Sequence, residues 1–218
     1  MEVIKTDIEG VVVIEPRVFR DPRGYFFESF SQRDFEEKVR KIHFVQDNES
    51  MSGYGVMRGL HFQSPPFSQS KLVRCVKGAV LDVAVDIRKG SPTYGKHIAC
   101  LLTGHDDEGR RIAETLFPEG LKGLERQPST MEGLQFFVPR GFAHGFSVLS
   151  ETAVFQYKCD NFYTPQADGG ISIVDDSLGI DWKIPVERAL LSDKDTHHCR
   201  LCDFDSPFCF SDNLYPEL

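Results

Sequence analysis

The sequence predicts an all-β protein, built as a sandwich or barrel of short strands with few helices. Short apolar runs recur at close spacing, and turns rich in glycine and proline separate them, such as Lys77-Gly78 and Lys89-Gly90-Ser91-Pro92. Repeated short strands joined in this way are typical of sandwiches and barrels. The chain has 218 residues, of which 40% are hydrophobic and 27% charged, and these values favour one globular domain.

One helix is expected near the N-terminus, and strands account for most of the rest. Residues 31–41 begin with a possible cap at Ser31 and place Phe35 and Val39 four positions apart, on one face of a helix. The residues on either side alternate between apolar runs and turns, as strands do. The expected strands are residues 11–14, 25–27, 72–76, 79–87, 97–102, 134–138, 145–149 and 153–158.

Residues 104–133 interrupt the strand pattern with seven acidic and four basic residues. Ile112 and Leu116 fit one short amphipathic helix in this stretch, which we interpret as an insertion on the barrel surface. We therefore expect a single domain over residues 1–196 that carries this insertion. The polar, cysteine-bearing tail at residues 197–218 is expected to pack loosely or at an interface.

Charge and cysteine usage argue against several classes of partner. The net charge is −8, so the chain lacks the basic surface of a dedicated nucleic-acid binder, although a few arginines could still hold a nucleotide. No apolar run approaches the ~18 residues that span a bilayer, and the N-terminal residues carry charges where a signal peptide would be apolar. The six cysteines are Cys75, Cys100, Cys159, Cys199, Cys202 and Cys209. Their positions are not those of a disulfide framework, which favours reduced thiols and a cytoplasmic protein.

Several polar side chains fall within or beside the expected strands. In residues 58–63, strand alternation places Arg58, Leu60 and Phe62 on one face and His61 and Gln63 on the other. The other candidates are Lys71, Asp82, Asp86, His144 and Tyr157. Charged groups that face into a barrel are costly unless they are paired, so several of them together predict a polar pocket.

Each of these residues also has an ordinary structural interpretation. A lone histidine in a strand is usually a satisfied structural residue, and Lys71 alone would be a solvated edge residue. Tyr157 alone would be a core aromatic with one hydrogen bond. The two aspartates could pair with Arg88 and Lys89 at the surface.

A metal site is not expected. Metal-binding barrels often carry a His-x-His pair, and here His61 is followed by Phe62-Gln63. The stretch from His197 to Cys202 holds a Cys-x-x-Cys spacing beside histidine, but only the lone Cys209 accompanies it. A zinc site of this type needs a second pair of ligands.

A series of motifs follows in order from about residue 3 to residue 196, with residues 104–133 as the main break. The motifs are Glu15-Pro16-Arg17-Val18-Phe19-Arg20-Asp21-Pro22-Arg23-Gly24, Phe44-Val45-Gln46-Asp47-Asn48, Arg58-Gly59-Leu60-His61-Phe62-Gln63, Lys71-Leu72-Val73-Arg74, Asp82-Val83-Ala84-Val85-Asp86-Ile87-Arg88, Gly141-Phe142-Ala143-His144-Gly145-Phe146, Tyr157-Lys158 and Leu191-Ser192-Asp193-Lys194-Asp195. This ordered series resembles the dTDP-4-dehydrorhamnose 3,5-epimerase family.

The resemblance implies a cupin-type double-stranded β-helix, or jelly-roll barrel, with a few short helices. It also implies a homodimer with exchanged N-terminal strands and no metal or other cofactor. The substrate would be a dTDP-linked sugar, dTDP-4-dehydro-6-deoxy-D-glucose, inverted at C3 and C5 to dTDP-4-dehydro-L-rhamnose for dTDP-L-rhamnose biosynthesis. The alternatives are inversion at C3 alone, another nucleotide sugar, a non-catalytic sugar-nucleotide binding cupin, and a metal-dependent cupin oxygenase.

The resemblance also assigns roles to single residues. His61 corresponds to the catalytic base, Asp195 to its carboxylate partner, Tyr157 to the acid on the opposite face, and Lys71 to the cation beside the C4 carbonyl oxygen. Positions that match substrate-binding residues are Arg23, Glu28, Gln46, Asn48, Arg58 and His144, while Phe19 and Phe162 match aromatics that flank the base.

Overall fold

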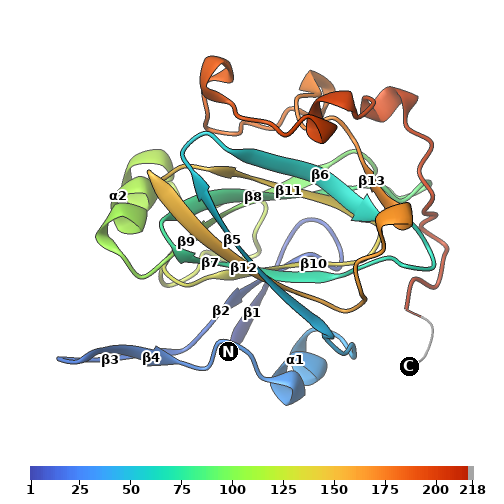
Figure 1. Ribbon diagram of the computed structural model, residues 1–218. Helices are drawn as coiled ribbons and strands as arrows, with labels where there is room; N and C mark the ends of the chain where they lie inside the picture. The colour runs from blue at the N-terminus through green and yellow to red at the C-terminus, as the bar shows by residue number, and fades with distance from the viewer. Residues whose placement is uncertain (216–218) are drawn as a thin grey trace.

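The computed structural model, which describes residues 1–215, consists mainly of two β-sheets packed face to face (Figure 1). The first sheet runs in the order β1 (Glu2–Lys5), β2 (Val12–Glu15), β10 (Gln135–Val138), β7 (Lys71–Lys77), β12 (Thr152–Cys159) and β5 (Gln46–Gly53). The second runs β13 (Asp168–Gly170), β6 (Met57–Gln63), β11 (Phe142–Val148), β8 (Ala79–Asp86) and β9 (His97–Thr103). The predicted all-β class is confirmed, and the two sheets fit a cupin-type jelly roll.

The core lies between the two sheets. The larger sheet contributes Phe136 and Phe155, and the smaller sheet contributes Leu60, Leu81 and Leu101, all of them at most 1% exposed. Burying one such side chain contributes about 1.5–3 kcal/mol relative to leaving it in water. Each expected strand is present, and its ends shift by no more than three residues.

The two α-helices of the described chain lie at the edges of this sandwich (Figure 1). Helix α1 (Gln32–Lys38) begins as expected at Ser31, whose hydroxyl accepts a hydrogen bond from the Asp34 N–H, and it buries Phe35 completely. Helix α2 (Asp107–Leu116) lies within residues 104–133, as expected, beside β8 and β9. Its buried residues are Gly109 and Ala113, whereas Leu116 at its end is largely exposed.

Strand β6 departs from the expected alternation. His61 pairs with His144 of β11 and Arg58 pairs with Phe146, so three steps on β6 oppose two steps on β11. This β-bulge turns Arg58 toward the same cavity as His61, which corrects the prediction that they occupy opposite faces. Only glycine fits at Gly59, because its φ is +129° and a Cβ there would lie 2.5 Å from the Gly145 Cα.

A two-stranded hairpin, β3 (Val18–Asp21) and β4 (Gly24–Phe27), projects away from both sheets (Figure 1). Large apolar side chains stand exposed on it, and Phe26 is 71% exposed. Strand β4 contacts the loop before α2, where the ring centroids of Tyr25 and Phe27 lie 4.1 and 5.3 Å from that of His105. Elsewhere the hairpin presents an apolar surface that no element within residues 1–215 covers.

The tail packs more closely than expected over its described part, residues 197–215, which runs along the outside of the barrel (Figure 1). Phe208 is buried against Phe62, and the Tyr215 hydroxyl lies 2.7 Å from Ser70 Oγ. These apolar and hydrogen-bonded contacts hold the tail against the barrel, and the polar composition of the tail did not predict them. Residues 216–218 of the predicted tail lie outside the described residues.

All six cysteines are free, and Cys199, Cys202 and Cys209 are exposed. This agrees with the prediction that they form no disulfide framework. Over residues 1–215, no helix has both the length and the apolar character needed to cross a membrane.

Candidate active site

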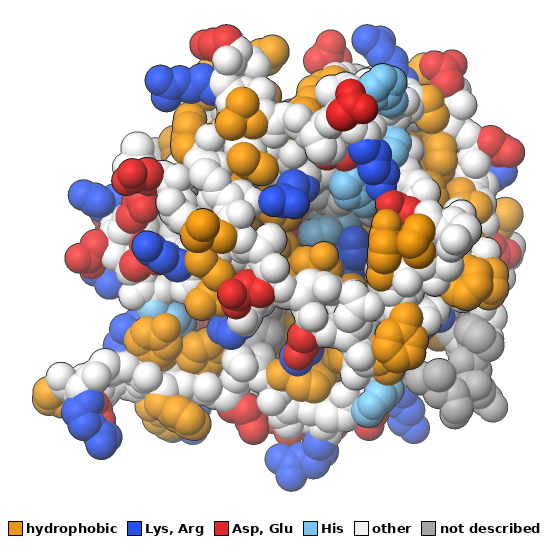
Figure 2. All heavy atoms as spheres, viewed as in Figure 1, with side chains coloured by type: hydrophobic (Ala, Val, Ile, Leu, Met, Phe, Trp, Pro, Cys, Tyr) orange, Lys and Arg blue, Asp and Glu red, His pale blue; other side chains and the backbone are white. Residues whose placement is uncertain are grey.

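A cavity of about 450 Å³ opens between the two sheets, within the size range of small-molecule sites. Figure 2 shows that this face of the molecule is hollowed, and histidine and basic side chains gather in the hollow. The predicted residues that line the cavity are Arg58, His61, Lys71, His144, Tyr157 and Asp195. They come from strands far apart in the sequence and from the short helix η4 (Lys194–His197).

His61 and Asp195 form a pair in which the carboxylate is buried and the imidazole is partly exposed. His61 Nε2 lies 2.5 Å from Asp195 Oδ1, and the backbone N–H of Asp195 donates to Ser192 Oγ, a bond within the turn that carries the carboxylate. Burial lowers the pKa of His61; the neighbouring carboxylate opposes this shift, and Lys71 and Lys194 add to it. The imidazole is therefore neutral near pH 7, with its Nε2–H directed at Asp195 and Nδ1 left to accept a proton.

Tyr157 and Lys71 lie on the other wall of the cavity. They belong to β12 and β7, neighbours in the larger sheet, whereas His61 belongs to β6 in the smaller sheet. The Lys71 ammonium lies 5.9 Å from the centroid of the Tyr157 ring. Burial raises the pKa of Tyr157, so the phenol keeps its proton at neutral pH and can act as a donor.

Lys71 brings an ammonium group to this wall of the cavity. Burial lowers its pKa, while the nearby Cys159, Asp82 and Asp168 groups raise it. An ammonium in this position can stabilise a developing negative charge on a bound oxygen.

Two further predicted residues are each held by a polar partner. His144 Nε2 lies 2.9 and 3.0 Å from the two carboxylate oxygens of Asp82, which is fully buried. Arg58 donates from Nη2 to Ser52 Oγ at 3.0 Å. Asp82 was already among the polar residues that the sequence analysis expected to face into the barrel, and it is one of two carboxylates in the apolar run 79–87. The surface pairing considered for Asp86 occurs with Arg88, but at a buried position, and Lys89 pairs instead with Asp205.

Gln46 and Asn48 lie beside the cavity on β5. Gln46 Nε2 donates to Asn48 Oδ1 at 3.0 Å, and Asn48 pairs directly with Tyr157 across the strands. Strand alternation puts them on the same face as Ser50, which lines the cavity and was missed by the sequence analysis. Extending that alternation from Asn48 would have found it.

The remaining predicted residues are not brought to the cavity of this chain. Phe19, Arg23 and Glu28 lie on or next to the projecting hairpin, where the Arg23 side chain is 89% exposed and pairs with Asp21. Phe162 is exposed in the loop after β12, and its backbone oxygen accepts a hydrogen bond from Gln63. Cys199 and Cys202 do not belong to a cluster of metal-ligating groups within the described residues.

The cavity can perform proton transfer on both faces of a bound molecule. A neutral imidazole backed by a carboxylate stands on one wall, a protonated phenol stands on the other, and an ammonium lies beside the phenol. This set suits removal of a proton next to a carbonyl group, stabilisation of the enolate oxygen, and return of a proton from the opposite side.

The comparisons with known proteins agree with this chemistry. The sequence model of a family described as dTDP-4-dehydrorhamnose 3,5-epimerase matches residues 5–119 and 125–203, so the stretch it leaves out within the predicted insertion is only 120–124. A protein from Shigella flexneri named dTDP-4-dehydrorhamnose 3,5-epimerase is 48% identical over 206 residues, which cover 94% of this chain and 98% of that protein.

Two solved structures extend the comparison. A dTDP-6-deoxy-D-glucose-3,5-epimerase from Legionella pneumophila, in complex with dTDP-4-keto-L-rhamnose, is 40% identical, with a TM-score of 0.78 and 94% of each chain covered. A 3′-monoepimerase from Streptomyces bikiniensis, in complex with dTDP-quinovose, is 29% identical, with a TM-score of 0.72, and the match covers 89% of this chain and 85% of that one.

Proposed function

This chain belongs to the dTDP-4-dehydrorhamnose 3,5-epimerase family, and from this premise we propose that it inverts C3 and C5 of dTDP-4-dehydro-6-deoxy-D-glucose. The product is dTDP-4-dehydro-L-rhamnose, an intermediate of dTDP-L-rhamnose biosynthesis. The observation that carries the proposal is the placement of His61 and Tyr157 on opposite walls of one cavity. Inversion at carbon requires a proton to leave from one face and another to arrive at the other face.

The C4 ketone acidifies the C–H bonds on C3 and C5. His61 Nδ1 accepts the proton from carbon, the C–H electron pair moves into the ring, and the negative charge collects on O4. Asp195 stabilises the imidazolium that forms, and Lys71 stabilises the enolate oxygen. Tyr157 then delivers a proton to the opposite face of the same carbon, and solvent returns the proton to the phenol while His61 releases its own.

Binding of the nucleotide falls to the residues around the cavity mouth. Arg58 carries a guanidinium that suits the pyrophosphate, because it can donate two parallel hydrogen bonds to phosphate oxygens. Asp82 holds His144 in one orientation toward the cavity. Gln46 and Asn48 offer amide groups beside it, where they can contact the sugar or the base.

A second candidate is inversion at C3 alone, which the likeness to the 3′-monoepimerase favours. Incubation of the protein with dTDP-4-dehydro-6-deoxy-D-glucose in D₂O, read by NMR and mass spectrometry, separates the two. We expect deuterium at both C3 and C5. Deuterium at C3 alone would assign the chain to the second candidate. No incorporation from this substrate, together with tight binding by calorimetry, would indicate a binding protein and contradict both.

The working unit is a homodimer with exchanged N-terminal strands, in which the hairpin of one copy completes the cavity of the other. The exposed apolar surface of β3 and β4 supports this, because such a surface gains free energy when a second copy covers it. The exchange would also account for Phe19 and Arg23, which match substrate-binding positions yet lie away from the cavity of their own chain.

Mixed dimers test the exchange. His61→Asn and Arg23→Ala are each expected to be nearly inactive alone, and co-refolding equal amounts should restore about a quarter of wild-type turnover. The reason is that random pairing makes about half of the dimers mixed, and each mixed dimer has one site with both residues intact. Activity no greater than the mean of the two variants would contradict the exchange. Wild type refolded with an equal amount of His61→Asn should give about half of wild-type turnover whether or not the chains mix, so this parallel sample reports the yield of refolding.

The six free cysteines, three of them exposed, support a reducing compartment, and we place the enzyme in the cytoplasm.

A further inference from the structure

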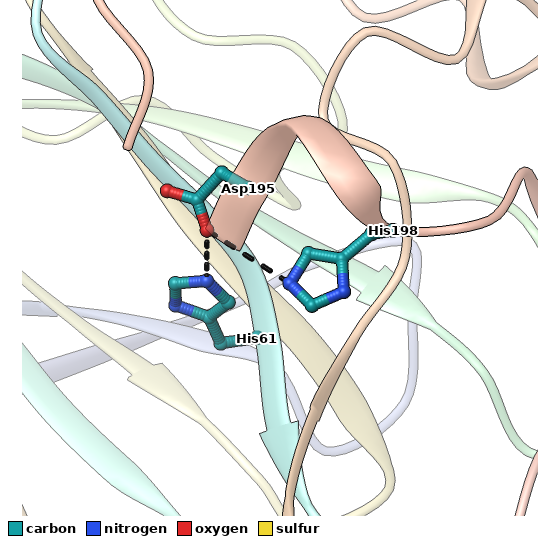
Figure 3. A group of neighbouring side chains, drawn as sticks. All are labelled: His61, Asp195 and His198. Atoms are coloured by element: carbon teal, nitrogen blue, oxygen red, sulfur yellow. Dashed lines mark hydrogen bonds and ion pairs between the residues drawn. The ribbon is translucent and has the colours of Figure 1, made fainter. Parts of the chain in front are cut away.

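The carboxylate of Asp195 faces two imidazoles, of which the proposed mechanism uses only one (Figure 3). His198 follows η4 three residues after Asp195, a spacing that puts both side chains on one side of the turn. Its Nε2 lies 3.9 Å from the Asp195 oxygen that His61 contacts at 2.5 Å, and the two histidine rings are nearly perpendicular, with centroids 5.7 Å apart. His198 was not among the residues predicted for the site.

The Nε2 atom of His198 is buried and has no hydrogen-bond partner within residues 1–215. A buried polar atom without a partner destabilises the fold, so the position of this ring calls for an explanation. The ring fits because residue 170 is glycine: a Cβ there would come within 2.6 Å of Nε2. The imidazole is therefore held with a free ring nitrogen directed at a carboxylate that already contacts a second imidazole.

Two imidazoles and one carboxylate are a common ligand set for zinc. The three donor atoms lie within 4.8 Å of one another. Bonds of about 2.1 Å in a tetrahedral site place neighbouring ligand atoms about 3.4 Å apart. The two distances from the Asp195 oxygen to the histidine nitrogens, 2.5 and 3.9 Å, lie on either side of this value. We propose that His61, Asp195 and His198 form a binding site for Zn²⁺ whose occupancy inhibits the enzyme. The fourth position faces the cavity, which His61 and Asp195 line, and a water molecule can fill it.

Inhibition follows from the ring proton of His61. In the free protein the neutral imidazole carries its proton on Nε2 and donates it to Asp195, which leaves Nδ1 to accept a proton from substrate. Zn²⁺ needs the lone pair of Nε2, so the ring proton moves to Nδ1 when the ion binds. The base then has no free lone pair in the cavity. This consequence rests on the proposed function, whereas the binding of the ion does not.

The surrounding charges limit the affinity. Asp195 is the one anionic ligand, and the ammonium groups of Lys71 and Lys194 both act on this site, although Lys194 is paired with Asp168. A cation gains less here than in a site with two carboxylates. We therefore expect a reversible inhibitory site that a chelator empties, and not a resident cofactor.

The first test measures binding without substrate. Metal-free protein is titrated with Zn²⁺ against a chromophoric chelator, and we expect one ion per chain. His198→Phe keeps an aromatic ring against Gly170 but removes the ligand, and it should weaken binding by at least about tenfold. His198→Gln should act in the same direction, and His197→Gln, which changes the exposed neighbour, should bind as wild type does. Equal affinity in wild type and His198→Phe would overturn the site.

The second test measures inhibition. Zn²⁺ should inhibit wild type and His197→Gln, EDTA should reverse this, and His198→Phe should need at least about tenfold more Zn²⁺ for the same inhibition. Zn²⁺ bound without loss of turnover would overturn the inhibitory role. Co²⁺ absorption distinguishes the ligands, because thiolate charge-transfer bands that vanish in Cys199→Ser would place the ion on the exposed cysteines and contradict the proposal. Absence of epimerase activity would contradict the proposed function. The binding test needs no activity, so it would still show whether Zn²⁺ binds at this site.

Discussion

Replacing His61 with Asn should abolish epimerisation while leaving the fold intact. Asn is close in size to the imidazole and can still hydrogen-bond to Asp195, but it cannot accept a proton from carbon. Loss of a general base costs about 10²–10⁴ in rate, or about 3–5 kcal/mol of transition-state stabilisation. Turnover of dTDP-4-dehydro-6-deoxy-D-glucose and deuterium incorporation from D₂O should fall together, because both begin with the same proton transfer.

The matched control is His43→Asn, which changes an exposed histidine that does not line the cavity. It should retain wild-type turnover, and both variants should keep the wild-type melting temperature within a few degrees. His61 lines a cavity and packs little apolar surface, so its loss removes little burial energy. A folded His61→Asn protein with unchanged turnover would remove the base from the mechanism.

Tyr157→Phe should separate the two halves of the reaction. The base still removes protons from carbon, so deuterium continues to enter the substrate, but the proton returns from the face that it left. Net inversion should fall by about 10²–10³, within the range for loss of a positioned acid. The diagnostic quantity is the ratio of deuterated unreacted substrate to inverted product, which rises in the variant and stays low in wild type.

Tyr94→Phe serves as the control, because this tyrosine lies in the turn between β8 and β9, outside the cavity. It should give the wild-type ratio of exchange to inversion. A normal yield of inverted product from Tyr157→Phe would refute the assignment of the acid. A variant that neither exchanges nor inverts would show that the phenol is needed for proton removal as well, against the proposed division of roles.

Most of the fold could be predicted from the sequence because strands and turns are local. Apolar alternation and Gly/Pro turns placed the strands to within a few residues, and Ser31 with Phe35 predicted α1. The close packing of the tail could not be predicted, because it depends on contacts far apart in the chain. Tyr215 bonds to Ser70, 145 positions earlier, and no local pattern contains that information.

The candidate site, too, could be predicted only in part. Resemblance to the family led to His61, Lys71, Tyr157 and Asp195, and all four line one cavity. Strand alternation failed at Arg58, since the bulge in β6 inserts one residue and reverses the face of everything before it. A single inserted residue leaves the composition of the motif unchanged, so only the pairing of β6 with β11 reveals it.

His198 was missed for a different reason. The sequence analysis examined His197–Cys202 for a Cys-x-x-Cys zinc site and found it incomplete. The partner of His198 is instead Asp195 on the preceding turn, and the third group is on β6. Two residues three positions apart lie side by side only if the segment forms a helical turn. The short, polar stretch that holds Asp195 and His198 does not predict such a turn.

His61 and Tyr157, the proposed base and acid, lie on separate sheets, and this has a consequence for how such a site can change. Two packed sheets stand roughly 10 Å apart, and the side chains of the core fix that spacing. The faces of the sugar from which a proton leaves and to which it returns are then set by the positions of the two sheets, and so by the packed core between them. Changes in the loops around the cavity can alter which nucleotide or sugar binds. The two sheets would still place one proton-transferring group on each side of the sugar ring.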